Sequence, residues 1–273
     1  MITTIEESRL LVVSDVHLGN PLFRSRRPFL EFLRYALAND FSVCINGDGV
    51  DIAQTSISRL THDLSESANY FGKFARSGLR IYYVVGNHDI VLEHFLDDWL
   101  VVRVVPFLNV MSGATRIRIE HGHVYDELFV AYPRIYSLFT WLGAFALNIH
   151  PRVYTSFEFL NTGITMLGQW RKSWGKREPE PETIPGEAAY FRVAAEEVSE
   201  RGFDYVLFGH THKLGQVVLP NGATYINTGA WQHHPYYCEI IDGRVELKRV
   251  PTMEEAETTR LSWANLIERT RGR

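Results

Sequence analysis

Short apolar runs alternate with amphipathic segments in the first third of the chain. The apolar runs predict buried strands at residues 10–14, 42–46 and 79–85. Between them, apolar residues recur at spacings of three and four from 28 to 37 and from 60 to 75, which predicts two helices. Strands and helices in alternation are typical of a parallel α/β sheet.

From residue 101 onward the pattern changes to a succession of strands. Glycine-containing turn signals separate these runs at 112–113, 220–222 and 242–243. The expected strands occupy residues 101–110, 115–120, 205–208, 215–219, 223–226, 236–241 and 245–250. We expect the late strands to be largely antiparallel. A capping box at 252–255 predicts a final amphipathic helix.

The segment 125–174 interrupts the pattern with a high density of aromatic residues. An acidic, proline-bearing stretch follows at 178–182 and is typical of a linker. We interpret residues 125–186 as a helical insertion and its linker. The insertion is set into a single domain formed by residues 1–124 and 187–273.

Two interpretations of the insertion remain open. In one, its aromatic side chains pack internally or at a dimer interface. In the other, it is a lid whose apolar face receives acyl chains or lies on a membrane surface, with basic residues toward anionic head groups. Those basic residues are Arg134, Arg152, Arg171 and Lys172. The apolar run at 135–149 is shorter than the ~20 residues that a spanning helix needs, so we expect no transmembrane segment.

Five apolar runs end in side chains that can bind metals. These side chains are Asp15 and His17, Asp48, Asn87, His121, and His210 and His212. The donors are carboxylate and amide oxygens and imidazole nitrogens, a set that suits Mn(II), Fe(II) or Zn(II). Side chains two residues apart in an extended segment point the same way, so each His/Asp or His/His pair can face one cavity. The sequence therefore predicts a metal site at the strand ends.

Composition places the chain among soluble globular proteins. Of its 273 residues, 45% are hydrophobic and 22% are charged, which are ordinary values. The formal net charge of −4 provides no broad basic surface, so nucleic acid is not an expected partner. Cys44 and Cys238 show no paired spacing, and the first residues lack a basic region followed by an apolar one. We expect a protein of the reducing cytoplasm.

The ordered set of motifs resembles that of the calcineurin-type metallophosphoesterase superfamily. The motifs are D-x-H at Asp15, G-D-x-x-D at Asp48, G-N-H-D at Asn87, H-G-H at His121 and G-H-T-H at His210. The whole set in order is far more specific than any one motif. The resemblance implies an α/β fold, namely an αββα sandwich of two sheets with a helical insertion, and a site at the strand ends.

The resemblance also implies two divalent metal ions, with Mn²⁺ expected first and Fe²⁺ or Zn²⁺ as alternatives. It assigns one ion to Asp15, His17, Asp48 and His212. It assigns the other ion to Asp48, Asn87, His121 and His210, so that Asp48 bridges. Two cations ~3.5–4 Å apart generate a hydroxide near neutral pH and orient an in-line displacement. The implied activity is hydrolysis of a phosphate ester or pyrophosphate bond by a bridging hydroxide that attacks phosphorus.

Catalytic roles are assigned to His88 and Asp51. As a hypothesis, His88 hydrogen-bonds the phosphoryl oxygen or protonates the leaving group, and Asp51 fixes its tautomer. Asp51 is alternatively a helix cap, and Asp89 is expected to be structural. Candidates for substrate contact are Arg24, Arg26, Arg27 and His123. Alternatively, the three arginines belong to a solvated basic loop, and His123 lies behind the metal ligands without touching the substrate.

Within the superfamily, the chain is most similar to the UDP-2,3-diacylglucosamine pyrophosphatase-like group. The similarity rests on the D-V-H-L start, the long aromatic insertion and the N-T-G-A-W turn at 227–231. It implies cleavage of the pyrophosphate of a lipid A precursor by a cytoplasmic enzyme peripheral to the inner membrane. The chain departs from the group at His88, where the group carries arginine, and at His123, where it carries an acidic residue.

These departures keep other functions open. One alternative is a phosphodiesterase or phosphomonoesterase of a soluble substrate, with the insertion as the surface of a homodimer. Another is a non-catalytic metal-binding scaffold. If the protein acts on a lipid A precursor, the expected partner is a nucleotide-linked lipid, and residues 125–174 associate with the membrane. If the substrate is soluble, the expected partner is a phosphorylated small molecule.

Overall fold

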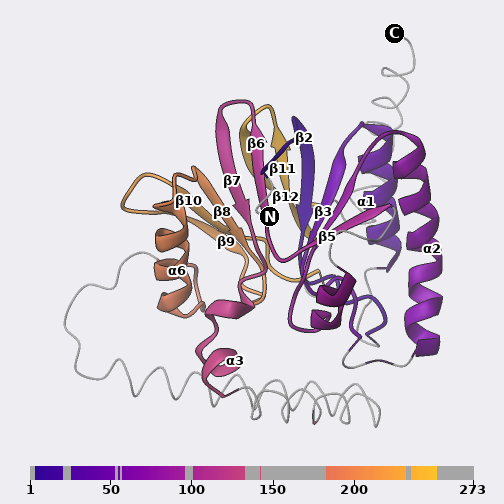
Figure 1. The fold of residues 1–273 in the computed structure, drawn as a ribbon, viewed down its shortest axis with the longest axis horizontal. Helices are drawn as coiled ribbons and strands as arrows, with labels where there is room; N and C mark the ends of the chain where they lie inside the picture. The colour runs from indigo at the N-terminus through magenta and orange to yellow at the C-terminus, as the bar shows by residue number, and fades with distance from the viewer. Residues whose placement is uncertain are drawn as a thin grey trace.

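The computed structural model describes residues 4–20, 26–52, 55, 57–95, 101–132, 142, 183–231 and 235–250. Within these residues, twelve strands form two six-stranded sheets (Figure 1). The β2 sheet has the order β12 (Arg244–Arg249), β11 (Tyr236–Ile241), β2 (Arg9–Val13), β3 (Ser42–Asn46), β4 (Ile81–Val84) and β5 (Val102–Val105). The β8 sheet has the order β1 (Thr4–Glu6), β6 (Leu108–Ser112), β7 (Thr115–Ile119), β8 (Tyr205–Phe208), β10 (Thr224–Asn227) and β9 (Gly215–Val218).

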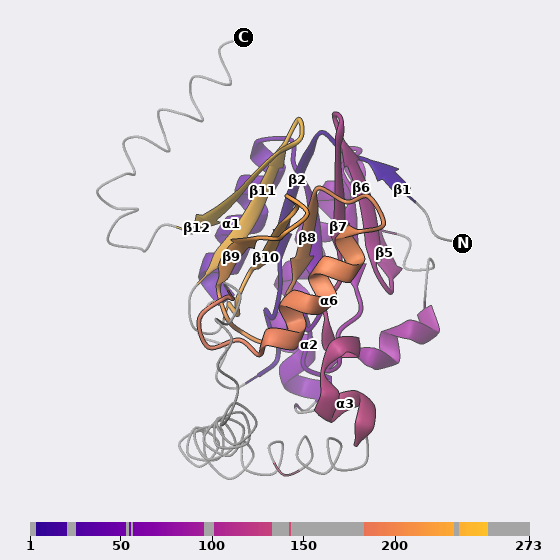
Figure 2. The same ribbon diagram turned by 90° about the vertical axis from the view of Figure 1, so that its left-hand side faces the viewer.

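Helices cover the outer faces of both sheets. α1 (Arg26–Ala38) and α2 (Ile57–Arg76) lie beside the β2 sheet, and α6 (Ala189–Ser199) lies against the β8 sheet (Figures 1 and 2). Shorter helical segments in the described part of the chain are η1 (Ile90–Phe95), η2 (His123–Tyr125) and α3 (Glu127–Ala131). Among the described residues, no helix is both long and apolar enough to cross a membrane.

Three clusters of buried side chains separate four layers. One cluster lies between α1, α2 and the β2 sheet, a second lies between the two sheets, and a third lies between the β8 sheet and α6. Strand β2 contributes to two of them because its side chains alternate between its faces. Leu11 and Val13 belong to the helix-facing cluster, whereas Leu10 and Val12 belong to the cluster between the sheets. The expected αββα arrangement is confirmed.

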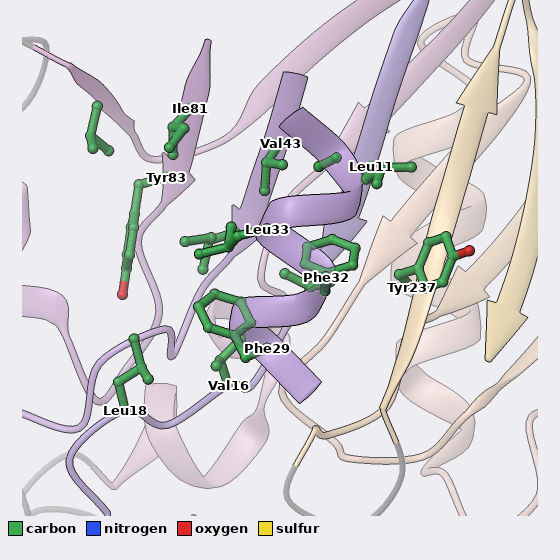
Figure 3. Close-up of a cluster of buried hydrophobic side chains, with 14 of the residues drawn as sticks. Leu11, Val16, Leu18, Phe29, Phe32, Leu33, Val43, Ile81, Tyr83 and Tyr237 are labelled. Atoms are coloured by element: carbon green, nitrogen blue, oxygen red, sulfur yellow. The ribbon is translucent and has the colours of Figure 1, made fainter. Parts of the chain in front are cut away.

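Helix α1 packs on the β2 sheet through one apolar face. Phe29, Phe32 and Leu33 are spaced to share that face, and Figure 3 shows them above the strands beside Val43. The rings of Phe29 and Phe32 also lie 5.5 and 5.3 Å from the ring of Trp231, which is completely buried. This contact ties the first helix to the turn that follows β10.

The carboxyl ends of the motif-bearing strands converge. β2, β3 and β4 are parallel neighbours in one sheet, and β7 and β8 are parallel neighbours in the other. Hydrogen bonds join the two edges: Asn46 Nδ2 donates to the carbonyl of Glu120 at 3.0 Å, and the amide of His210 donates to Asp15 Oδ2 at 3.2 Å. The loops that carry the five motifs therefore meet in one place.

The single strand expected at 101–110 is wrong. The structure has β5 and β6 there, and the two strands belong to different sheets. Pro106 lies between them and has no N–H to contribute to a ladder. The next residue, Phe107, places its ring under the guanidinium of Arg118, 3.4 Å from the ring centroid. The chain crosses from one sheet to the other at this point.

The late strands are largely antiparallel, as expected, and β11 also pairs with β2 in this sense. β9 pairs with β10, and β11 pairs with β12, both in the expected antiparallel sense. Asp242 and Gly243 have φ values of 48° and 88°, as a type I′ hairpin turn requires. However, β10 pairs with β8 in parallel, which the pattern did not predict. β1 and α6 were also not predicted. The final helix at 252–266 and most of the insertion at 125–186 lie outside the described residues.

We expect Phe29→Ala to lower the free energy of unfolding by about 3–5 kcal/mol, because it removes a fully buried ring and leaves a cavity against Trp231. Urea unfolding followed by tryptophan fluorescence would measure the change. Val218→Thr is the matched control, since Val218 is 68% exposed and the replacement keeps its β-branched shape. We expect that control to stay within about 0.5 kcal/mol of the parent.

Candidate metal centre

Five of the seven predicted ligands are held in an unusual backbone conformation. Positive φ values occur at Asp15 (52°), His17 (53°), Asp48 (49°), His210 (65°) and His212 (58°). Only a few per cent of non-glycine residues adopt this left-handed region, and each such residue costs about 1–3 kcal/mol. The only other non-glycine residues with positive φ in the described part of the chain are Asp40 and Asp242. Backbone strain is thus concentrated at the loops that carry the motifs.

Backbone hydrogen bonds fix the loop after β2 against the loop after β3. The amide of Asp15 donates to the carbonyl of Gly47 at 3.1 Å, and the amide of His17 donates to the carbonyl of Asp48 at 2.8 Å. Glycine is needed where side chains come closest to the backbone. A Cβ on Gly47 would lie 2.3 Å from the ring of His121, and one on Gly86 would lie 2.2 Å from Asp48 Oδ1.

Asp15, His17 and His212 form one group of donors. One potential ligand atom from each lies within 4.8 Å of the others, and His212 Nε2 is 3.1 Å from Asp15 Oδ1. The imidazole of His17 is 2% exposed, and within the described residues neither of its ring nitrogens has a hydrogen-bond partner. A buried polar group without a partner costs about 1–3 kcal/mol. A cation among these donors would satisfy it.

Asp48, Asn87, His121 and His210 form a second, continuous set. His121 Nε2 lies 3.2 Å from Asp48 Oδ2 and 3.1 Å from Asn87 Oδ1, and His210 Nδ1 lies 2.8 Å from the same amide oxygen. His121 Nδ1 is 2.9 Å from the carbonyl of Asn46, to which it donates. Nε2 is therefore the nitrogen that would give up its proton and offer a lone pair to an ion beside Asp48.

The two sets are adjacent. Donor atoms of Asp15, Asp48 and His121 also lie within 4.8 Å of one another, and all three side chains are buried. The structure thus brings together all seven residues that the motifs predicted as ligands. Their oxygen and nitrogen donors fit divalent ions such as Mn²⁺, Fe²⁺ or Zn²⁺.

His88 and Asp51 lie next to this group. His88 Nδ1 is 3.1 Å from Asp51 Oδ1, and the other carboxylate oxygen accepts a 2.7 Å hydrogen bond from Asn20 Nδ2. His17 Nδ1 is 3.6 Å from Asp51 Oδ2, and the rings of His17 and His88 are 4.9 Å apart. Asp51 could join His17 and His88 as a ligand group. Because both of its oxygens already accept hydrogen bonds, its geometry suits orientation of the two imidazoles.

The local charges keep the central carboxylate ionised. Burial alone would raise the pKa of Asp48, but the charges of His121 and His88 hold that pKa well below its usual range. Burial would likewise lower the pKa of His88, yet Asp48 and Asp51 raise it to about 10. Asp48 is therefore in the form that a metal requires, and His88 carries a proton that it can donate.

Two of the three arginines expected to contact substrate lie beside other polar and charged side chains. The guanidinium of Arg26 lies 2.8 Å from His62 Nε2 and 3.2 Å from a carboxylate oxygen of Glu66, and Arg27 pairs with Glu31 at 3.2 Å. Arg24 lies outside the described residues. None of these observations tests contact with a substrate, which stays a prediction for all three arginines.

His123 is buried beside the second set of donors. Its ring centroid is 5.5 Å from that of His121 and 6.4 Å from that of His210. Burial, together with the charges of these two histidines, lowers the pKa of His123 to about 3. This neutral ring lies beside His121 and His210, and its contact with substrate also stays a prediction.

Two carboxylates of the site were missed by the sequence analysis. Asp126 Oδ2 lies 2.9 Å from His210 Nε2. Glu187 Oε1 accepts hydrogen bonds from Thr211, Tyr225 and Asn227. Neither residue belongs to a motif: Asp126 is 84 residues from its partner, and Glu187 follows a stretch already rich in glutamate. Asp89, expected to be structural, accepts hydrogen bonds from Tyr83, Gly49 and Gly86.

Comparison with protein families gives a direct result. The family model described as calcineurin-like phosphoesterase matches residues 8–214, well over half of the chain. The chain belongs to this family. As a calcineurin-like phosphoesterase it has the two-sheet α/β sandwich typical of these proteins. The family implies a metal-dependent hydrolase of phosphoesters, in agreement with the clustered donors.

Several solved structures are similar to the chain at low sequence identity. A dimetal phosphatase from Danio rerio is 12% identical, with 88% of this chain and 95% of that chain covered and a TM-score of 0.49. Vacuolar protein sorting 29 from Cryptosporidium parvum is 16% identical, with 89% and 97% covered and a TM-score of 0.36. Wild-type Vps29 complexed with zinc from Entamoeba histolytica is 14% identical, with 89% and 98% covered and a TM-score of 0.38. No curated protein matches the sequence.

We expect the parent protein to bind two Mn²⁺ ions per chain and His17→Ala to bind fewer, because the replacement removes a buried imidazole from the first group of donors. Elemental analysis after equilibration with Mn²⁺ and desalting would measure this stoichiometry. His94→Ala is the matched control, since His94 is exposed and its ring contacts the carbonyl of Val91 in its own turn. Equal metal content in both variants would contradict the assignment of His17.

Proposed function

We propose that the protein hydrolyses a phosphate ester or pyrophosphate bond with the help of two divalent metal ions. The observation that carries this proposal is the position of His88 and Asp51, which lie against a cluster of seven metal-capable donors, four of them buried. A scaffold that only binds metal has no use for an imidazole that a carboxylate holds in place beside the ions. A hydrolase needs one to stabilise the phosphoryl oxygen or the leaving group.

The seven donors divide into two ligand sets in this proposal. Asp15, His17 and His212 would hold one ion together with Asp48. Asn87, His121 and His210 would hold the other, so that Asp48 would serve both. When bound, the two ions neutralise the phosphate, lower the pKa of water and orient the displacement. Mn²⁺ is the first choice, with Fe²⁺ and Zn²⁺ as alternatives that the same donors accept.

His88 supplies the proton chemistry. Its Nδ1 donates to Asp51 Oδ1, so Nε2 is the atom that hydrogen-bonds the phosphoryl oxygen or gives a proton to the leaving oxygen. The amide of His88 donates to Asp48 Oδ1 at 2.8 Å, which fixes the backbone of this residue to the shared carboxylate. Asp51 fixes the orientation of the ring by accepting a hydrogen bond from Nδ1–H, which leaves Nε2 to face the substrate.

For the substrate, we propose a nucleotide-linked lipid of the UDP-2,3-diacylglucosamine type. The D-V-H-L start, the aromatic segment 125–174 and the N-T-G-A-W turn support this choice. The same segment would associate with the inner face of the membrane. His88 and His123, which stand where that group carries arginine and an acidic residue, favour a second candidate, a phosphodiesterase or phosphomonoesterase of a soluble substrate.

Turnover of bis-p-nitrophenyl phosphate with Mn²⁺ tests the proposed chemistry. We expect His88→Ala to lower kcat by about 10²- to 10⁴-fold, since it removes the positioned acid. We expect Asp48→Ala to show no turnover above the buffer rate, because the carboxylate shared by both metal sets is gone. His94→Ala should match the parent. Equal rates in all four proteins would contradict the proposal that this site hydrolyses phosphoesters.

Competition between nucleotide sugars tests the lipid substrate. We expect an acylated UDP-sugar to inhibit hydrolysis of the generic substrate at least about tenfold more strongly than its deacylated form, because a tenfold difference needs only about 1.4 kcal/mol and each buried methylene contributes about 0.8 kcal/mol. Inhibition constants for the two compounds provide the comparison. The same constant for both would favour the soluble substrate.

A further inference from the structure

The two ring nitrogens of His210 face different partners. Nδ1 lies 2.8 Å from Asn87 Oδ1, on the side of the other donors, and Nε2 lies 2.9 Å from Asp126 Oδ2. An ionised carboxylate can only accept hydrogen bonds, so Nε2 is the donor in this pair. A neutral imidazole that is protonated at Nε2 has its lone pair at Nδ1. When an ion lies beside Asn87 Oδ1, the contact with Asp126 would select the tautomer whose Nδ1 lone pair faces that ion.

The other surroundings of the imidazole are mostly rings. The centroids of His121, Phe191 and His123 lie 5.4, 6.0 and 6.4 Å from that of His210. Such contacts limit the space around the ring, but they do not distinguish its two nitrogens. The side chains of His210 and Asp126 are 9% and 21% exposed, so the hydrogen bond between them is largely shielded from water.

The backbone on either side of His210 is fixed separately. Asn227 Nδ2 donates to the carbonyl of Gly209 at 2.9 Å, and Glu187 Oε1 accepts from Thr211 Oγ1 at 2.8 Å. These contacts hold the main chain of the loop but do not restrain rotation of the imidazole about its own bonds. The contact with Asp126 supplies that restraint.

We propose that Asp126 is a positioning residue that holds His210 in the tautomer and orientation needed to bind the second metal ion. This inference depends on the proposed function at one point, namely that His210 binds one of the two metal ions. A carboxylate that accepts the distal N–H of a metal-binding histidine fixes the ring and makes it a better ligand, and its loss typically weakens metal binding by about 10- to 100-fold.

Titration calorimetry of the metal-stripped full-length protein with Mn²⁺ alone tests this role. For Asp126→Ala we expect one of the two Mn²⁺ affinities to fall by about 10- to 100-fold and the other to change less. Asp126→Asn should recover most of the loss, because its amide oxygen still accepts the Nε2 proton. Glu127→Ala removes the same charge from the next, exposed residue and should bind as the parent does.

A double-mutant cycle separates positioning from a general effect on stability. In the His210→Ala background, Asp126→Ala should weaken Mn²⁺ binding no further, because there is no imidazole left to orient. The inference is overturned if Asp126→Ala binds both ions as the parent does, if Asp126→Asn is as weak as Asp126→Ala, or if the loss is the same with and without His210.

Turnover measured on the same samples keeps the two proposals apart. A parent that binds two Mn²⁺ ions without hydrolysing any phosphoester overturns the proposed function and leaves the role of Asp126 intact. A parent that hydrolyses phosphoesters while Asp126→Ala binds Mn²⁺ normally overturns the role of Asp126 alone.

Discussion

Two acidic side chains, Asp15 and Asp48, lie buried where the edges of the two sheets meet, with exposures of 0% and 2%. Removing an ionised carboxylate from water costs several kcal/mol unless opposite charge compensates it. In this protein the imidazoles of His212 and His121 lie 3.1 and 3.2 Å from the two carboxylates. The need to compensate this charge explains why so many nitrogen donors gather at one place, and why divalent cations fit among them.

The positions of the ligands were predictable because each follows an apolar run and belongs to a recognisable motif. Their convergence followed from strand direction, since parallel neighbours such as β2, β3 and β4 end at the same edge. Asp126 and Glu187 were not predictable in this way. Each acts through a contact that only the folded chain creates, and neither has a spacing or a motif that distinguishes it from a surface carboxylate.

The errors in the predicted fold have physical causes. Apolar periodicity reports that a strand is buried, but in a sandwich both faces of a central strand are buried and the pattern does not say which sheet it joins. Hence 101–110 read as one strand, although Pro106 divides it between two sheets. In α6, Phe191, Ala194, Ala195 and Val198 have helical spacing and are buried. Two of these four are alanines, so the apolar signal after the acidic linker was weak.

The strained geometry of Asp48 is maintained by a polar contact beneath it rather than by apolar packing alone. Asp89 accepts hydrogen bonds from the amide of Gly49 at 3.0 Å, from the amide of Gly86 at 2.6 Å and from the hydroxyl of Tyr83. One carboxylate thereby joins the loops after β3 and β4, between which Asp48 Oδ1 meets the amide of His88. A left-handed residue persists only where its surroundings over-determine it. The order of the metal centre and the stability of these two loops therefore depend on the same buried group.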